Sequence, residues 1–298
     1  MSVVSELYQV VSRPEVSEPV VVVGLDGWID AGFGAAGAMA HLLKTLDTTL
    51  VATFDADGLV DHRSRRPVLH LVEGVNTGLT WPSIELRHGR DLDGRHLLLL
   101  AGTEPDLRWR AFAAGVADLT AELGGRLVVG FGAYPAPVPH TRDVRLASTA
   151  TTSELAHRVG QVRSTIDVPA GVQGAIERRC ADAGLPAVGL WAQVPYYVAN
   201  MAYPQASAAL VAGLTRLGTL RLDDAALRDA GRRVRTQLDA VVADNPEHEE
   251  MVHGLERAHD TEMAGTGPAW GPDLPSGDEL AAEVERFLRD VGQGGGQD

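Results

Sequence analysis

The sequence predicts an α/β protein in which helices pack on a largely parallel sheet. Short apolar runs rich in β-branched residues, such as Pro19–Leu25 and His96–Ala101, are typical of strands that are buried on both faces. These runs alternate along the chain with segments of helical periodicity. Such alternation favours a layered fold with parallel strands.

The strands that we expect are justified by their apolar pattern and by the turn residues around them. Ser83–Arg87 alternates between apolar and polar residues, which indicates an edge strand or one with a single buried face. The other strands that we expect lie at Pro19–Leu25, Leu50–Phe54, Val68–Val72, His96–Ala101, Leu127–Tyr134 and Ala187–Val194, with a further extended segment at Asp143–Thr152. Of these, Pro19–Leu25, His96–Ala101 and Leu127–Tyr134 are expected to be buried.

The helices that we expect lie between these strands. Ala31–Leu46 contains many small residues, so it should pack closely on the sheet. The Glu104-Pro105-Asp106 sequence should begin a helix, because proline and acids suit a first turn, and Gly124-Gly125 should end it. Further helices are expected at 153–162, 172–183 and 205–217.

Composition limits the class of protein. The chain has 298 residues, and 45% of them are hydrophobic, as in ordinary globular proteins. No apolar run approaches the ~20 residues of a membrane span, and we expect no signal peptide. The single cysteine, Cys180, fits a reducing compartment. The expected location is the cytoplasm.

The net charge of −14 is concentrated near the end of the chain. Residues 223–298 carry 18 acids and 7 bases, whereas residues 1–222 carry 22 acids and 19 bases. No basic surface is in excess, so nucleic acid is disfavoured as a partner. Lys44 is the one lysine, which leaves little room for Schiff-base or Walker-type phosphate chemistry.

The acidic excess after residue 222 coincides with a change from alternating strand and helix patterns to helical spacing of the apolar residues. We therefore expect two domains. Residues 1–222 form the α/β core, and residues 223–298 form an acidic helical module. Asp223 and the Asn245-Pro246 pair are expected to begin two helices of this module. Residues 265–277 hold four Gly and three Pro and should be a linker, and the tail from residue 292 should be disordered.

A proline-rich loop after the strand at Leu127–Tyr134 is the candidate site. Three prolines between residues 135 and 139 stiffen it, and it presents His140, Thr141 and Arg142 at the carboxyl end of a core strand, where open α/β folds place sites. Neighbouring strand-end loops add the remaining candidates, which are Asp26, Asp30, Glu104 and Arg108.

Two interpretations of this cluster remain open. Arg142 could hold an anion bidentately, with His140 as proton donor. Alternatively, Arg142 pairs with Asp26, Asp30, Glu104 or Asp106 across neighbouring strand ends. The sequence favours the ion pair, because structural ion-pair networks are common.

Other motifs are better explained by packing. Gly32–Gly37 matches the dinucleotide-binding pattern G-x-G-x-x-G, but it begins six residues after the strand, so close helix–sheet packing is favoured. Asp30 is expected to cap a helix. His248 and His253 are five apart, about 140° on a helix, so both cannot bind one metal. We expect no cofactor and no metal site.

Five segments resemble the proteasome assembly chaperone 2 family in its actinobacterial form. The resemblance covers about residues 18–240. It is carried by Gly24-Leu25-Asp26-Gly27-Trp28-Ile29-Asp30-Ala31-Gly32, Phe54-Asp55-Ala56-Asp57, Asp61-His62-Arg63-Ser64-Arg65-Arg66-Pro67, Gly102-Thr103-Glu104-Pro105-Asp106-Leu107-Arg108-Trp109 and Pro139-His140-Thr141-Arg142.

The resemblance implies a phosphorylase/hydrolase-like α/β/α sandwich, homo-oligomerisation with a trimer as the first expectation, and no established catalytic residue. It also implies proteasome subunits as a candidate partner, although the C-terminal hydrophobic-Tyr-any docking motif of several relatives is absent from the Gly-Gly-Gly-Gln-Asp ending. The sequence therefore favours a non-enzymatic, homo-oligomeric protein-binding scaffold. The alternative is an enzyme or a binder of small anions or phosphometabolites, which would use the cleft around His140 and Arg142.

Overall fold

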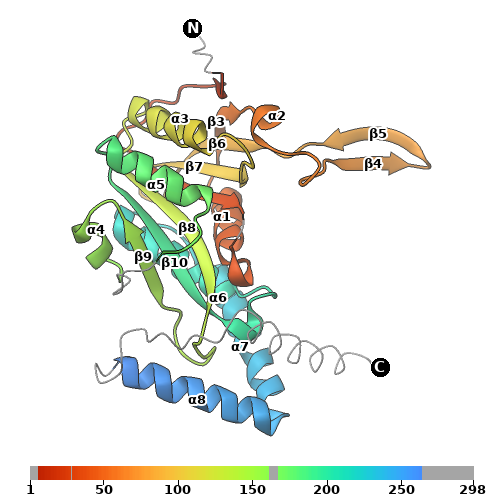
Figure 1. The fold of residues 1–298 in the computed structure, drawn as a ribbon, viewed down its shortest axis with the longest axis vertical. Coiled ribbons are helices and arrows are strands. Elements are labelled where there is room, and N and C mark those ends of the chain that lie inside the picture. The colour runs from red at the N-terminus through yellow and green to blue at the C-terminus, as the bar shows by residue number, and fades with distance from the viewer. Residues whose placement is uncertain (1–5, 28, 161–166, 264–298) are drawn as a thin grey trace.

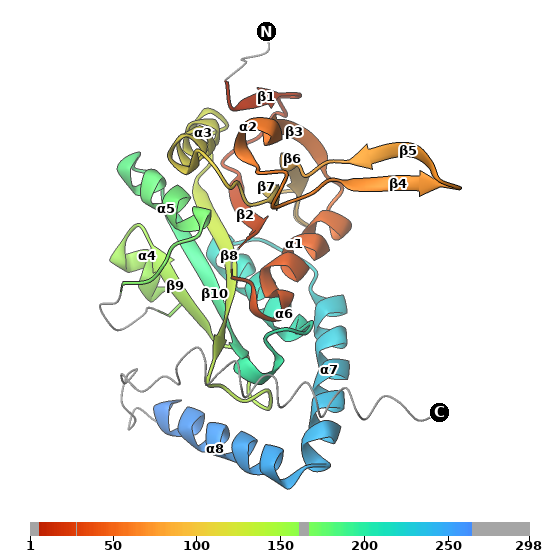
Figure 2. The same cartoon turned by 45° about the vertical axis from the view of Figure 1, so that its right-hand side comes forward.

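The computed structural model describes residues 6–27, 29–160 and 167–263 of the chain. Its centre is a sheet of eight strands in the order β1-β3-β6-β7-β2-β8-β10-β9, and a separate two-stranded hairpin projects from one side (Figures 1 and 2). The strands of the sheet are β1 (Tyr8–Val10), β2 (Val20–Asp26), β3 (Thr49–Phe54), β6 (Ile84–Arg90), β7 (His96–Thr103), β8 (Leu127–Ala136), β9 (Leu146–Ala150) and β10 (Ala187–Pro195).

The sheet is mixed, which corrects the expectation of a largely parallel one. The four central strands β7, β2, β8 and β10 run parallel, whereas β1, β3, β6 and β9 pair antiparallel with their neighbours. The continuous apolar runs that suggested parallel strands are the four central ones. The antiparallel strands flank them on both sides, where the sequence is less uniformly apolar.

Helices cover both faces of the sheet, so the predicted three-layer α/β/α sandwich is confirmed. On one face α1 (Gly34–Thr45) and α6 (Pro204–Gly218) pack against strand residues such as Val22 and Leu99. On the other face α3 (Trp109–Glu122) and α5 (Val172–Asp182) pack against Val21 and Leu98. Successive residues of each central strand therefore belong to different hydrophobic cores.

The glycine-rich start of α1 serves close packing. A short 3₁₀ turn, η1 (Ala31–Phe33), precedes the helix. A Cβ atom placed on Gly34 would lie 3.0 Å from side chains of Ala133 and Ala206, and one placed on Gly37 would lie 2.5 Å from Ser207 Oγ. The packing interpretation of the G-x-G-x-x-G pattern is confirmed, because these glycines let α1 approach α6 and the sheet.

The third helix begins later than the sequence predicts. α3 starts at Trp109, and Arg108 before it has a left-handed backbone (φ 56°). Pro105 accepts a hydrogen bond from the Trp109 indole N–H, and a carboxylate oxygen of Asp106 accepts one from the backbone N–H of Asp61. The Pro and Asp that resembled a first helical turn belong instead to a loop that is fixed by its side chains.

The connection between β3 and β6 contains the predicted strand at Val68–Val72 and two elements that the sequence did not predict, a short helix and the second strand of a hairpin. The short helix α2 (Ala56–Leu59) is followed by β4 (Val68–Val72) and β5 (Val75–Thr80), which pair only with each other. Gly, Asn and Pro residues between positions 72 and 83 are typical of a turn region. Asn76 and Gly78 lie instead in β5, and the turn itself is reduced to Glu73 and Gly74, both at positive φ.

The remaining described elements complete the second half of the chain. α4 (Ser153–His157) is shorter than expected, and the 3₁₀ turn η2 (Tyr196–Val198) follows β10. Then α7 (Ala225–Ala243) and α8 (Pro246–Met263) extend from the core. Leu238 and Val242 of α7 and Val252 of α8 are buried in the same cluster as α1 and α6. The predicted linker at 265–277 and the tail from 292 lie outside the described residues.

In the described part of the chain, every helix is too short or too polar to cross a membrane.

The separability of residues 223–298 remains a prediction. All eight strands of the sheet and the helices on both of its faces precede residue 223. We therefore expect a chain that ends at Leu222 to stay folded. It should melt on the order of 10 °C below the full chain, because it loses three buried apolar side chains. Thermal unfolding followed by circular dichroism tests this. Absence of a cooperative transition would place the helices within the core domain.

Candidate functional site

The loop after β8 carries the sequence-predicted residues His140, Thr141 and Arg142 to the two C-terminal helices. Figure 1 shows this loop reaching towards α8, at the carboxyl end of β8. All three side chains contact acids of α7 or α8. The proline-stiffened loop is thus the surface on which α7 and α8 dock.

His140 is buried, with only 2% of its surface exposed. The Tyr197 hydroxyl accepts a hydrogen bond from the His140 backbone N–H (2.8 Å) and lies 2.7 Å from Nδ1. Nε2 is 3.2 Å from a carboxylate oxygen of Asp239 on α7. We infer that the ring proton lies on Nε2, because the Asp239 carboxylate accepts rather than donates, which leaves Nδ1 to accept from the Tyr197 hydroxyl.

Burial lowers the pKa of His140, and the nearby Asp239 carboxylate only partly opposes this effect. The imidazole is therefore neutral near pH 7. Burial also raises the pKa of the Tyr197 phenol far above its ordinary value, so its hydroxyl stays protonated. The pair forms a neutral hydrogen-bonded contact between the loop and the core.

Arg142 pairs with two acids on one face of α8. Its Nε and Nη2 donate to the two carboxylate oxygens of Asp260 at 2.9 and 2.8 Å, and Nη1 donates to Glu256 at 2.9 Å. Thr141 Oγ1 donates to the same Glu256 oxygen at 2.5 Å. The hydrogen bond from Arg142 lowers the pKa of Asp260 to about 2.

The expected partners of Arg142 were wrong, although an ion pair is formed. We expected Asp26, Asp30, Glu104 or Asp106, all of which lie in loops at neighbouring strand ends. The structure supplies Glu256 and Asp260 instead, which stand four residues apart on α8. Residues i and i+4 of a helix share a face, so one guanidinium can bridge both.

Sequence reasoning also missed Arg145 and the acids of the C-terminal helices. Arg145 donates to Glu262 of α8 at 2.7 and 3.3 Å, which adds a third acid of this helix to the contact. The signal that could have found these pairs was the acidic excess after residue 222, set against an arginine-rich segment at 142–145.

The other candidates lie around a pocket of about 620 Å³ at the carboxyl ends of β2 and β8. Asp26, Asp30, Phe33, Pro135 and Asn200 are among the residues that line it. Phe33 has a left-handed backbone (φ 51°), which is unusual for an aromatic residue, and 55% of its surface is exposed.

The two aspartates of this pocket have different tasks. Asp30 accepts hydrogen bonds from the backbone N–H groups of Ala35 and Ala36 at 2.7 and 2.9 Å, so it caps α1 as predicted. Its partial burial raises its pKa, and those bonds oppose the rise. Partial desolvation also raises the pKa of Asp26, which the charge of Arg65 opposes. Asp26 is left as the acid of this pocket that faces solvent.

Glu104 and Arg108 take structural positions next to this pocket. Glu104 is buried, and one of its carboxylate oxygens accepts a hydrogen bond from the Val172 backbone N–H (2.6 Å), at the first residue of α5. Arg108 lies beside the Asp55 loop, since its Nη1 and Asp55 Oδ2 both stand within 4 Å of where a Cβ of Gly58 would be.

The candidate cluster is therefore divided. His140, Thr141 and Arg142 hold α7 and α8, whereas Asp26 and Asp30 line the open pocket, and Glu104 and Arg108 support the loops beside it. Within the described ranges, no three His, Cys, Asp or Glu side chains gather in a way that could hold a metal ion. Whether the pocket binds a small molecule stays a prediction.

The burial of His140 should make stability depend on pH. Its pKa is lower in the folded protein than in the unfolded chain, so the unfolded chain binds more protons below pH ~6.5. Stability should fall as the pH drops from 6.5 towards the folded pKa, by at most about 1.4 kcal/mol per pH unit from this group. Urea unfolding of His140→Gln should show a smaller loss between pH 7.5 and 5.5. The exposed His157→Gln should behave like the parent, and equal slopes for all three proteins would contradict this expectation.

Removal of the Arg142 guanidinium should loosen α8. Because Arg142 bonds to Glu256 and Asp260 at once, Arg142→Ala should make amide hydrogen exchange in α8 severalfold faster and leave the central strands unchanged. The matched control is Arg178→Ala, which removes an exposed pair with Asp182 inside α5. Equal exchange of α8 in parent and Arg142→Ala would show that other contacts hold this helix.

Comparisons with known proteins agree on one family. The PAC2 family model matches residues 24–242. A Corynebacterium glutamicum protein of unknown function is 31% identical, with a TM-score of 0.83, over 88% of this chain and 100% of the other. A Mycobacterium tuberculosis protein of unknown function is 34% identical, with a TM-score of 0.81, over 93% of this chain and 96% of the other.

A third solved structure carries a more specific description. It is a proteasome-assembly chaperone homologue from M. tuberculosis, 32% identical with a TM-score of 0.73 over 78% of this chain and 99% of the other. A search of curated proteins found no match. The family model covers most of the α/β sandwich and α7, and the similar structures share the fold at above 30% identity. The chain therefore belongs to the PAC2 family.

Proposed function

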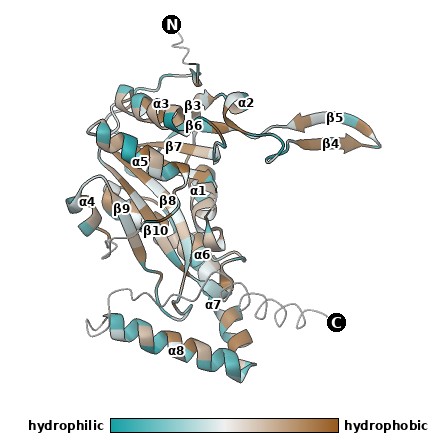
Figure 3. Ribbon diagram, in the orientation of Figure 1, coloured by the Kyte–Doolittle hydropathy of each residue, from teal (hydrophilic) through white to brown (hydrophobic). Residues whose placement is uncertain are grey.

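We propose that this protein is a non-enzymatic, homo-oligomeric scaffold with a chaperone-like role in binding other proteins. The observation that carries the proposal is the β4–β5 hairpin, which stands away from the sandwich (Figure 1) and has exposed apolar side chains. Figure 3 shows hydrophobic residues along β4. The exposed side chains, between 43 and 63% accessible, are Val68, Leu69, Leu71, Val72, Val75 and Leu79.

An isolated hairpin of this kind is poorly suited to water. Two-stranded hairpins are marginally stable by themselves, and contiguous exposed apolar residues mark interaction sites. Both edges of the hairpin lack a strand partner in the described chain. Between Val68 and Thr80, Glu73 is the only ionised side chain when histidine is counted as neutral. The surface therefore suits an apolar partner rather than a charged one.

We propose that a second copy of the same chain covers the exposed hairpin. Each copy would contribute one hairpin to its neighbour, and contacts of this head-to-tail type close into a ring. A trimer is the form that we propose, because family resemblance favours it. We place this assembly in the cytoplasm, in keeping with its single buried cysteine.

The proposed protein partners are proteasome components. The support is the similarity to the M. tuberculosis proteasome-assembly chaperone homologue, which is 32% identical. With the hairpins buried between copies, a ring would present its helical C-terminal surfaces as several identical contacts to such a partner, and repeated weak contacts add up to strong binding.

Analytical ultracentrifugation of the full chain tests the assembly. We expect a mass near three times the 31.6 kDa of one chain at micromolar concentration. The double variant Leu71→Asp with Leu79→Asp should sediment as a single chain, since each aspartate places a charge in the apolar contact. Leu92→Asp is the control, because Leu92 is 64% exposed but lies outside the hairpin. A monomeric parent would exclude the ring.

The same variants test whether the protein binds proteasome components. Affinity capture at native expression level with quantitative mass spectrometry should enrich proteasome subunits with the parent and with Leu92→Asp. The hairpin double variant should capture less, because it offers one contact in place of three. Enrichment of a different protein would keep the scaffold and remove the proteasome from the proposal.

The alternative is a binder of small anions or an enzyme at the cleft near His140 and Arg142. Strand-end pockets commonly hold ligands, and one lies at the carboxyl ends of β2 and β8, but it is lined by Asp26 and Asp30 and by neither His140 nor Arg142. For Arg142, the carboxylates of Glu256 and Asp260 already occupy the positions that an anion would take. Phosphate that displaced them would speed amide exchange in α8 of the parent, whereas the scaffold proposal expects no effect.

A further inference from the structure

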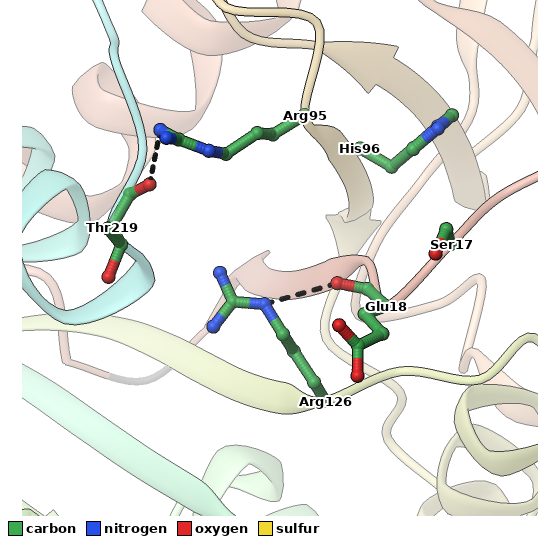
Figure 4. Close-up of a pocket in the computed structure, with 6 residues that line it drawn as sticks. All are labelled: Ser17, Glu18, Arg95, His96, Arg126 and Thr219. Atoms are coloured by element: carbon green, nitrogen blue, oxygen red, sulfur yellow. Dashed lines mark hydrogen bonds between the residues drawn. The ribbon is translucent and has the colours of Figure 1, made fainter.

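A second pocket lies at the opposite end of the parallel strands. It has a volume of about 460 Å³ and is lined by Ser17, Glu18, Arg95, His96, Arg126 and Thr219. These residues precede β2, β7 and β8 or follow α6, so the pocket stands where the central strands begin (Figure 4). The candidate residues described above stand where the same strands end.

Arg126 is held in this pocket by main-chain carbonyls. Its Nε donates to the carbonyl of Glu18 at 3.1 Å, and its Nη2 donates to the carbonyl of Gly218. Among the described residues, no carboxylate lies within ion-pair distance of this guanidinium. Two of the five N–H donors of arginine are used, so three remain for a ligand, and the charge is not neutralised by a direct partner.

Arg95 is held in a similar way on the other side of the pocket. Its Nη1 donates to the carbonyl of Thr219 at 2.6 Å. It also faces two acids, Asp93 at 3.4 Å and the buried Asp91 at 3.8 Å. In Figure 4 the guanidinium groups of Arg95 and Arg126 lie on either side of Thr219.

The two residues whose carbonyls accept these hydrogen bonds have left-handed backbones, and one of them, Thr219, ends α6. Glu18 (φ 45°) and Thr219 (φ 51°) are two of the five residues other than glycine at positive φ in the described chain. The carbonyls of these same two residues receive the arginine hydrogen bonds. Non-glycine residues persist in this region only when their surroundings hold them, so the two carbonyls that accept from the arginines are held in fixed positions.

The local charge is positive although the chain is acidic. Arg90 and Arg221 stand next to the pocket. Burial and the charge of Arg90 lower the pKa of His96, and Arg221 pairs with Asp93 at 3.0 Å. Four arginines therefore face three acids, Glu18, Asp91 and Asp93, in a chain of net charge −14. A guanidinium with unused donors in such a place attracts an oxyanion.

We propose that this pocket binds a small phosphate-type oxyanion, with Arg126 as the principal ligand and Arg95 and Ser17 as further donors. A phosphoryl group offers several acceptor oxygens and up to two negative charges, which matches two guanidinium groups approaching from different sides. Glu18 supplies its main-chain carbonyl to position Arg126, while its own carboxylate opposes the anion.

The test uses inorganic phosphate and pyrophosphate as probes on the full chain. Amide signals of the perdeuterated protein are followed by TROSY spectroscopy at constant ionic strength, with chloride as the reference anion. We expect saturable shifts that cluster at residues 17–19, 95–96, 126 and 218–219. Arg126→Gln should weaken binding about tenfold or more, as loss of a charge-assisted contact does.

Two further variants separate a binding role from a structural one. Glu18→Gln keeps the main-chain carbonyl and removes the opposing charge, so it should tighten binding severalfold. An arginine that only caps the end of α6 predicts no such gain. Arg110→Gln removes an exposed arginine of α3 and should leave the affinity unchanged.

The proposal is overturned by any of three results. They are shifts that do not saturate at these amides, equal weakening by Arg126→Gln and Arg110→Gln, and an unchanged affinity in Glu18→Gln. If Arg126→Gln does not fold, Arg95→Gln and Glu18→Gln carry the same test with opposite expected signs.

Discussion

The burial of four parallel strands on both faces is the constraint on which the rest of the structure depends. β7, β2, β8 and β10 leave no face of the central sheet for water, so helices must cover both sides. That requirement explains the small residues of α1, which comes close enough to α6 and β8 that a methyl group on Gly34 would touch both. It also aligns the ends of the parallel strands, so that one pocket forms where these strands begin and another where they end.

The central strands and most helices could be predicted from sequence because their signal is local. A short run of β-branched residues such as Val20–Val23 favours a buried strand over a helix. The antiparallel strands β3, β4 and β6 could be predicted as strands but not in their direction, and β1 and β5 were not predicted. Val75–Thr80 contains Asn and Gly, and its pairing depends on contacts with β4 that residue preferences do not express. The prediction of the start of α3 was wrong for a related reason, since the loop around Asp106 is fixed by the Asp61 backbone, 45 residues earlier in sequence.

The candidate site shows the same limit at the level of side chains. The strand-end rule pointed to the loop that holds His140 and Arg142, and ligand binding there stays a prediction. It could not name Tyr197, Asp239 or Glu256, because these partners come from other elements whose approach is decided by packing. The capping role of Asp30 was predictable, since the acceptor and the helix start lie within six residues of each other. Long-range ion pairs carry no such local signature.

The position of the hairpin within the chain has a consequence for how such proteins can diverge. β3 and β6 are adjacent antiparallel strands, and the hairpin lies in the connection between them. Its length and sequence can therefore change without altering the register of any strand in the main sheet. A lineage, or a protein engineer, could exchange this one insertion and redirect the binding of the molecule while the two hydrophobic cores stay as they are.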